Sequence, residues 1–319
     1  MLRSLSPTSL GVLTALTAYA VYSIADAMVK GLGGELSVFE IGFFTTLFSV
    51  IPALFSKPAD ERWRDTFKLR RPWLMGLIAV CRTASAMLIT YSFVTIPLAE
   101  AYSLVFLIPV MTIVLSVVVL RERVGLERWA LAIISFVGVL IVVRPGFKEI
   151  ELGHITAFGC AISAAISVTA MRLISGEERK VTLFALPGLL TLIANAIGLV
   201  IFGAIWPGWM LLGGLLVCGV LGGIGYLLQI AAVTLAPASR VAPMQYSQIV
   251  WALLFGALFF EEVPDAVGLV GLALVVAAGI GNIFIDGARA RIAGRWAEYR
   301  ARRDQPEPSG FEGPGPDPV

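Results

Sequence analysis

The sequence predicts an all-α membrane protein whose ten transmembrane helices form two inverted five-helix repeats. Three observations predict this fold class. Hydrophobic residues make up 58% of the 319 residues and charged residues only 14%, whereas soluble domains carry about 25% charged residues. Ten apolar segments are long enough to cross a bilayer. Finally, the pattern of residues 97–145 recurs in residues 237–284.

The predicted spans follow one another with short connections. A helix needs about 20 mostly apolar residues to cross the hydrocarbon core. The segments that qualify, some with a polar interruption, are residues 9–30, 38–56, 73–94, 98–120, 127–144, 152–174, 181–205, 210–234, 239–260 and 266–285. The first lacks a small-residue cleavage site, so we expect a retained helix and not a signal peptide.

The repeat divides the chain into two halves. Pro97 corresponds to Pro237, and Glu122 corresponds to Glu262, with the same separation in the sequence. Each copy consists of an apolar segment, a short charged joint and a second apolar segment. Residues 9–145 are predicted to form the first repeat, 152–285 the second, and 286–319 a cytoplasmic tail that is basic and then disordered. Because five spans is an odd number, the second repeat enters the membrane upside down. Inverted repeats of this kind are typical of transporters.

Positive charge predicts the orientation. With the N-terminus placed in the cytoplasm, twenty lysines and arginines lie at the inner face and three (Lys30, Arg144 and Lys148) at the outer face. Arg82 lies within a span. This bias follows the positive-inside rule, so both termini are expected to be cytoplasmic.

Several classes of function find no support in the sequence. The three cysteines lie far apart in apolar segments and there is one histidine, His154, which argues against a disulfide framework or a metal site. We find no nucleophile or base constellation, so no catalytic residue is assigned. The expected partners are a small-molecule solute and the lipid bilayer, without cofactor, metal or nucleic acid, and no pattern specifies an oligomeric state. A membrane-embedded enzyme or a receptor is the alternative outside transport.

Charged residues inside spans are costly unless they are paired or line a cavity. Asp26 and Lys30 stand at i and i+4 on the first span, so they are expected to pair, and Asp26 and Glu100 are candidate proton carriers. Arg82 lies near mid-depth and is expected to face water or a carboxylate. Glu100 and Arg240 occupy the same position in their repeats. They mark either the two mouths of one transport pathway or the ends of two helices at the membrane interfaces.

The acidic residues at the joints are expected to be structural. Glu122, Glu261 and Glu262 lie between consecutive spans, where a carboxylate can cap the N-terminus of the next helix. His154, at the outer start of the sixth span, is expected to be an interface histidine.

These residues carry a family resemblance. Residues 91–97 (YSFVTIP), Ile108-Pro109 and residues 121–124 (RERV), with Pro237, Glu262 and Val263 in the second half, resemble the ten-helix EamA branch of the drug/metabolite transporter (DMT) superfamily. The resemblance covers about residues 9–285. It implies a transporter of the bacterial inner membrane whose substrate cavity is lined largely by helices three, four, eight and nine.

Three stretches resemble bacterial S-adenosylmethionine uptake transporters: residues 23–30, 39–44 and 241–246. Riboflavin uptake transporters are a second near group. Thr45 stands where these relatives often carry an arginine.

The expected substrate site consists of polar and aromatic residues within spans: Arg82, Tyr91, Glu100, Tyr102, Tyr226, Gln229, Gln245, Tyr246, Gln248 and Trp251. Amides offer donors and acceptors, and rings offer stacking faces. This lining favours a planar, hydrogen-bonding solute, and riboflavin uptake is the first expectation. S-adenosylmethionine uptake is the second, because a sulfonium would call for Asp26 or Glu100. Export of amino acids or other small metabolites, with Arg82 on a carboxylate, is the third.

Overall fold

The structure of the protein is a computed structural model, which describes residues 7–56, 68–119, 121, 125–144, 149–174, 178, 180–203, 206–235 and 242–281. Every regular element in these ranges is a helix. Six helical stretches are long and apolar enough to cross a membrane, and four shorter apolar helices accompany them. Glu122, Arg240 and the predicted tail 286–319 lie outside the described residues.

The helices of the first half are α1 (Pro7–Leu32), α2 (Val38–Ser56), α3 (Pro72–Thr95), α4 (Leu98–Val105), α5 (Ile108–Val118) and α6 (Leu126–Val143). Those of the second half are α7 (Leu152–Leu173), α8 (Lys180–Phe202), α9 (Trp209–Leu235), the 3₁₀ helix η3 (Ala242–Tyr246), α11 (Ser247–Phe259) and a last helix, Ala266–Gly281.

Helix ends follow from local chemistry. Ser37 and Glu40 form a capping box at the start of α2, with Ser37 N–H 2.7 Å from Glu40 Oε2 and Glu40 N–H 3.2 Å from Ser37 Oγ. Pro72 lies in the first turn of α3, where its missing N–H costs nothing. Helix α3 ends just before Pro97, because a residue that precedes proline avoids the α conformation.

The fourth predicted span, 98–120, is not one helix. It breaks into α4 and α5 at Phe106 and Leu107. Pro109 has no N–H to donate to the carbonyl of Val105, and the chain tightens so that Leu107 N–H bonds to the Leu104 carbonyl at 3.0 Å. In the ninth span the described residues likewise begin with η3 before the chain becomes α-helical at Ser247.

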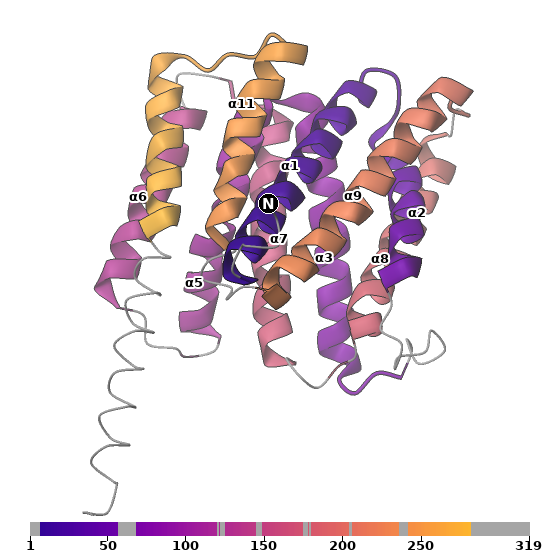
Figure 1. Cartoon of the computed structure of the whole chain (residues 1–319), viewed down its shortest axis with the longest axis horizontal. Helices are drawn as coiled ribbons and strands as arrows, with labels where there is room; N and C mark the ends of the chain where they lie inside the picture. Colours follow the sequence, from indigo (N-terminus) through magenta and orange to yellow (C-terminus); the bar gives the residue numbers. More distant parts are fainter. Residues whose placement is uncertain are drawn as a thin grey trace, which may run out of the picture.

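Helices of the two halves interleave. In Figure 1, α6 and the last helix lie at one side, α2 and α8 at the other, and α1, α3, α7, α9 and α11 between them. Helix α1 packs along α9, and α3 packs along α7. Helix α2 approaches α9 closely, because a Cβ at Gly219 would lie 2.6 Å from the Thr45 carbonyl oxygen. Thr45 is therefore part of a helix-packing seam.

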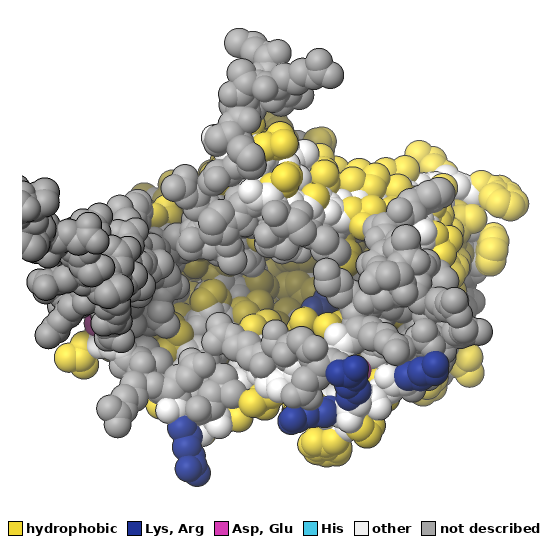
Figure 2. All heavy atoms as spheres, turned by 60° about the horizontal axis from the view of Figure 1, so that its bottom comes forward, with side chains coloured by type: hydrophobic (Ala, Val, Ile, Leu, Met, Phe, Trp, Pro, Cys, Tyr) yellow, Lys and Arg dark blue, Asp and Glu magenta, His cyan; other side chains and the backbone are white. Residues whose placement is uncertain are grey.

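One face of the molecule is hollowed. Figure 2 shows the face that forms the bottom of Figure 1, with hydrophobic side chains on the floor of the hollow and lysine and arginine side chains along its lower rim. The connection between α11 and the last helix runs over the opposite face, at the top of Figure 1. The described structure therefore has a hollowed face and, across the bundle, a face crossed by this connection, which we call the covered face.

Candidate functional site

The central polar group joins three helices from both halves. The Tyr102 hydroxyl of α4 donates a hydrogen bond to the carboxylate of Asp26 on α1. The Gln248 amide of α11 lies 3.5 Å from the same hydroxyl, at the limit of a hydrogen bond. No described lysine or arginine forms an ion pair with Asp26. A half-buried carboxylate thus lies where α1, α4 and α11 meet, held by a phenol.

The expected pairing of Asp26 with Lys30 is wrong. Lys30 Nζ lies 2.8 Å from Glu262 Oε1 and 2.7 Å from the Ile96 carbonyl oxygen. Sharing one helix face is not enough to pair them, because Asp26 turns toward α4. Lys30 instead reaches a carboxylate and the C-terminal carbonyls of α3, where the helix dipole favours a cation.

A second polar group links α1 to α9. The Gln229 amide lies between two phenols: Tyr22 OH donates to Gln229 Oε1 at 3.3 Å, and Gln229 Nε2 donates to Tyr19 OH at 3.3 Å. Neither Tyr19 nor Tyr22 is among the site residues expected from the sequence. Tyr19, Tyr22 and Asp26 stand at i, i+3 and i+7, so the helical spacing of polar residues on the first span was the signal that could have revealed them.

Arg82 lies near the middle of α3 and its side chain is exposed. It is within electrostatic range of the hydroxyls of Tyr22 on α1 and Tyr226 on α9. An exposed guanidinium at this depth requires water, and these neighbours place it between α1, α3 and α9. Among the described residues, Arg82 is the only arginine that lies in the interior of a predicted span.

A row of rings continues the site from α3 to η3. Phe93 and Tyr102 have centroids 5.3 Å apart, Tyr102 and Phe106 6.2 Å, and Phe106 and Tyr246 5.0 Å. Tyr246 also lies directly against Gly279 of the last helix, where a Cβ would come within 1.7 Å of its ring. Phe93, Tyr102 and Phe106 are buried in the core, so they pack the helices of the two halves together. The half-buried rings of Tyr22 and Tyr226, near Arg82, can accommodate a flat or cationic group.

The remaining expected residues lie elsewhere or make no described polar contact. Trp251 stacks on Phe255 at 5.7 Å and lines an apolar groove between α1 and α11. Gln245 lies half-buried in η3, and Tyr91 half-buried near the end of α3. The central cluster is therefore smaller than the expected set.

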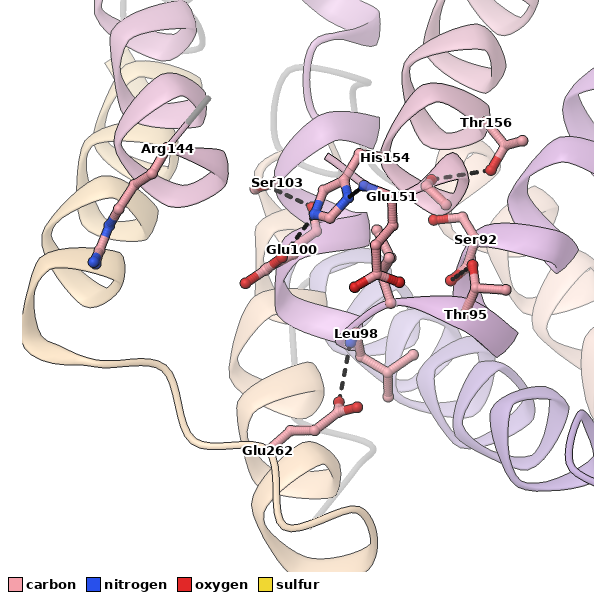
Figure 3. Close-up of polar contacts among 12 residues, drawn as sticks. Ser92, Thr95, Leu98, Glu100, Ser103, Arg144, Glu151, His154, Thr156 and Glu262 are labelled. Carbon is pink, nitrogen blue, oxygen red and sulfur yellow. Dashed lines mark hydrogen bonds and ion pairs between the residues drawn. The ribbon is translucent and has the colours of Figure 1, made fainter. Parts of the chain in front are cut away.

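Glu100 belongs to a separate cluster at the covered face. His154 Nε2 lies 2.9 Å from Glu100 Oε2, and the Glu151 N–H donates to His154 Nδ1 at 3.2 Å. Because Nδ1 accepts, the ring proton of neutral His154 lies on Nε2 and is donated to the carboxylate. Figure 3 shows this contact beside the start of α4. His154 lies in the first turn of α7, and the sequence could not identify Glu100 as its partner.

The acidic joint of the second half is also part of this cluster. Glu262 Oε2 accepts a hydrogen bond from the Leu98 N–H at 3.3 Å (Figure 3). It therefore caps α4 in the first half, and the expectation that it caps the next helix is wrong. Asp265 performs that role, accepting from the Gly268 N–H at 2.9 Å, and it also pairs with Arg144. Among the described residues, no group of three or more His, Cys, Asp or Glu side chains could hold a metal ion.

Known proteins resemble this chain over nearly its whole length. A model described as "EamA-like transporter family" matches residues 9–144 and 151–284. The S-adenosylmethionine uptake transporter of Rickettsia bellii is 26% identical over 287 residues, which cover 89% of this chain and 96% of that protein. That of Rickettsia felis is 25% identical over 272 residues, covering 83% and 89%.

Two further similarities are to an exporter and to a solved structure. The pseudopaline exporter CntI of Pseudomonas aeruginosa is 28% identical over 277 residues, covering 85% of this chain and 94% of the exporter. A solved crystal structure superimposes with a TM-score of 0.60 at 16% identity, covering 88% of this chain and 96% of its own. At that identity the superposition supports the fold alone.

Proposed function

This chain belongs to the EamA-like transporter family, and from that premise we propose that it takes up S-adenosylmethionine across the bacterial inner membrane by alternating access. Membership makes it a membrane transporter of a small solute. Substrate, direction, orientation and mechanism are the proposal.

Alternating access rests on the two repeats being inverted copies, and two contacts support this. Helix α1 packs along α9, and α7 packs along α3. In the two repeats α1 corresponds to α7, and α9 corresponds to α3. Exchanging the two halves therefore converts one of these helix pairs into the other. Phe106 and Tyr246 occupy equivalent positions in the repeats, and their rings lie 5.0 Å apart. Equivalent residues in contact are expected at a pseudo-twofold axis. Two inverted halves around a central site can exchange inward-open and outward-open shapes.

The single observation that carries the substrate proposal is that two opposite charges within the bundle, Asp26 and Arg82, form no described ion pair with each other. Asp26 is held by the neutral phenol of Tyr102, and Arg82 stands exposed between tyrosines. S-adenosylmethionine has a sulfonium and an ammonium for a carboxylate, a carboxylate for a guanidinium and an adenine ring for aromatic faces. Each group of the solute thus has a complementary group among the described side chains.

Riboflavin, the first expectation, has less support. That expectation rested on an aromatic and amide lining and on the arginine missing at Thr45. Of the amides, Gln229 binds Tyr19 and Tyr22, and Gln248 approaches Tyr102. The relatives given above are named for S-adenosylmethionine and pseudopaline. The exporter among them is the reason to test direction explicitly.

The orientation is supported by charge. If lysines and arginines mark the cytoplasm, the hollow of Figure 2 opens inward, since that face carries the positively charged rim. The covered face, with Glu100, His154 and Glu262, then lies outside.

The test is uptake of radiolabelled S-adenosylmethionine by cells that express the chain and lack a transporter for it. We expect label to accumulate, to be chased by excess unlabelled compound, and to be recovered chemically unchanged. Sealed vesicles should show counterflow. Riboflavin and a panel of amino acids, tested as competitors and as export substrates, distinguish the alternatives. Normal protein levels without S-adenosylmethionine uptake or counterflow would rule out the proposal, and conversion of the label would indicate an enzyme.

A further inference from the structure

We propose that Lys30 and Glu262 form the outer gate of the transporter by clamping the corner between α3 and α4. This outer clamp consists of Lys30, Glu262 and residues 96–98. The proposal rests on the alternating access proposed above but not on the identity of the solute.

The corner is held from both sides by opposite charges. Lys30 of α1 binds the carbonyl oxygen of Ile96 at 2.7 Å, the last backbone acceptor before Pro97. Glu262, on the connection between α11 and the last helix, accepts from the Leu98 N–H at 3.3 Å, and its other oxygen lies 2.8 Å from Lys30 Nζ. The ring of Phe260 lies 5.4 Å from the same ammonium. Lys30 and Glu262 thus hold the backbone on both sides of Pro97, and the contacts of Glu262 tie this corner to the second half.

The clamp lies where the two halves meet at the covered face. All three ion pairs between described residues join the first half to the second: Lys30 with Glu262, Glu100 with His154, and Arg144 with Asp265. The hollow of Figure 2 opens on the other face. The described conformation is therefore closed at the clamp and open at the hollow, and outward opening requires these cross-half contacts to separate.

Burial and fixed charge together select the pair that controls this step, because the Glu100–His154 pair, although its side chains are only 14% and 7% exposed, is an ion pair only when His154 is protonated. The side chains of Lys30 and Glu262 are 9% and 23% exposed, whereas those of Arg144 and Asp265 are 21% and 55% exposed. Exposed pairs are screened by water and contribute little, while a partly buried charge that loses its partner is costly. The Lys30–Glu262 pair should hold the closed state, and the Arg144–Asp265 pair serves as a matched control.

The experiment measures which side of the membrane the cavity faces. Arg82→Cys, with Cys81, Cys160 and Cys218 replaced by Ser, places a reporter thiol at an exposed position within the bundle. Intact cells are treated with a membrane-impermeant maleimide. We expect slow labelling in this background, and labelling at least about tenfold faster after Glu262→Gln or Lys30→Met, which corresponds to about 1.4 kcal/mol. Asp265→Asn should leave the rate unchanged.

Glu262→Gln keeps an acceptor for the Leu98 N–H, so the corner can stay folded while the ion pair is lost. Cys160, buried in α7, reports unfolding when restored as the only cysteine. Unchanged outside labelling of Arg82→Cys in both clamp variants would overturn the proposal. So would labelling of Cys160 in Glu262→Gln, which would make the clamp a requirement of folding, or equally fast labelling after Asp265→Asn. Failure of S-adenosylmethionine uptake affects none of these outcomes.

Discussion

At the scale of single residues, the charged side chains inside the bundle fall into two groups: those that pair within the protein and those for which no ion pair is described. Lys30 and Glu262 neutralise each other and bind backbone groups, so their charges are used within the protein. Asp26 receives only a neutral phenol from the described side chains that bond it, and Arg82 stays exposed. A charge that the protein leaves available can be neutralised by a solute, which is why we assign recognition to Asp26 and Arg82.

Replacing the charge of Asp26 should weaken uptake while the fold is kept. In Asp26→Asn the amide oxygen still accepts the Tyr102 hydrogen bond, but the attraction for a cationic group is lost. Hydrogen bonds to charged groups contribute about 1.5–3 kcal/mol, so we expect the KM for S-adenosylmethionine to rise roughly ten- to hundredfold. Initial uptake rates over a range of concentrations measure this change.

A matched control is Glu40→Gln, which makes the same chemical change at a buried carboxylate outside the central cluster. Glutamine serves in a capping box as glutamate does, so uptake by this variant should remain near the parent value. An unchanged KM in Asp26→Asn would contradict the assigned role.

At the scale of helices, small residues set how closely the elements approach. The seam between α6 and the last helix depends on two glycines: a Cβ at Gly271 would lie 2.7 Å from the Gly138 carbonyl oxygen, and a Cβ at Gly138 would lie 2.8 Å from the Gly271 carbonyl oxygen. Close backbone approach through small residues is the usual way in which membrane helices associate. A backbone oxygen cannot rotate away from an added Cβ as a side chain can. A Cβ at either glycine would therefore force the two helices to shift apart.

Gly271→Ala should therefore separate α6 from the last helix and destabilise the protein. Overpacking costs typically about 1–3 kcal/mol, seen as a lower midpoint for thermal unfolding in detergent. Gly213→Ala, on α9, is the control, because a Cβ there meets nothing within 4 Å. An equal midpoint for the two variants would show that the seam can relax without cost.

At the scale of the whole molecule, the distribution of positive charge predicts how the bundle lies in the membrane. Gly34 follows α1 and Arg70 precedes α3, and both are exposed. If the N-terminus is cytoplasmic, successive ends of the helices alternate between the two faces, so Gly34 lies outside and Arg70 inside.

Single cysteines at these two positions test the orientation. An impermeant maleimide added to intact cells should label Gly34→Cys, and it should label Arg70→Cys only in inside-out vesicles. The opposite pattern would reverse the bundle and would place the clamp at the cytoplasmic side. Labelling of both in intact cells would indicate leaky cells, which a cytoplasmic marker protein detects.

Much of the architecture could be predicted because it depends on local composition. A backbone in hydrocarbon must satisfy its own hydrogen bonds, so each apolar segment of sufficient length is a helix, and the described helices follow the predicted segments. The break between α4 and α5 was missed, although its cause, Pro109, is itself local. The boundaries of the repeats and the inversion of the second remain predictions from pattern and charge.

The site was predictable only as a list of unusual residues. Asp26, Arg82, Tyr102, Gln229 and Gln248 attract notice because polar groups are expensive inside a span. Sequence spacing suggested a partner for Asp26 on its own helix, and the tertiary structure supplied Tyr102 from another.

The amino-acid sequence by itself determined that this chain is helical, lies in the membrane and belongs with ten-helix transporters, because hydropathy and motif are properties of short stretches. Only the tertiary structure decided that Lys30 meets Glu262, that His154 meets Glu100, and that Phe106 meets Tyr246. Each of these contacts joins residues of different halves, and which of many polar or aromatic groups become neighbours depends on how all the helices pack together.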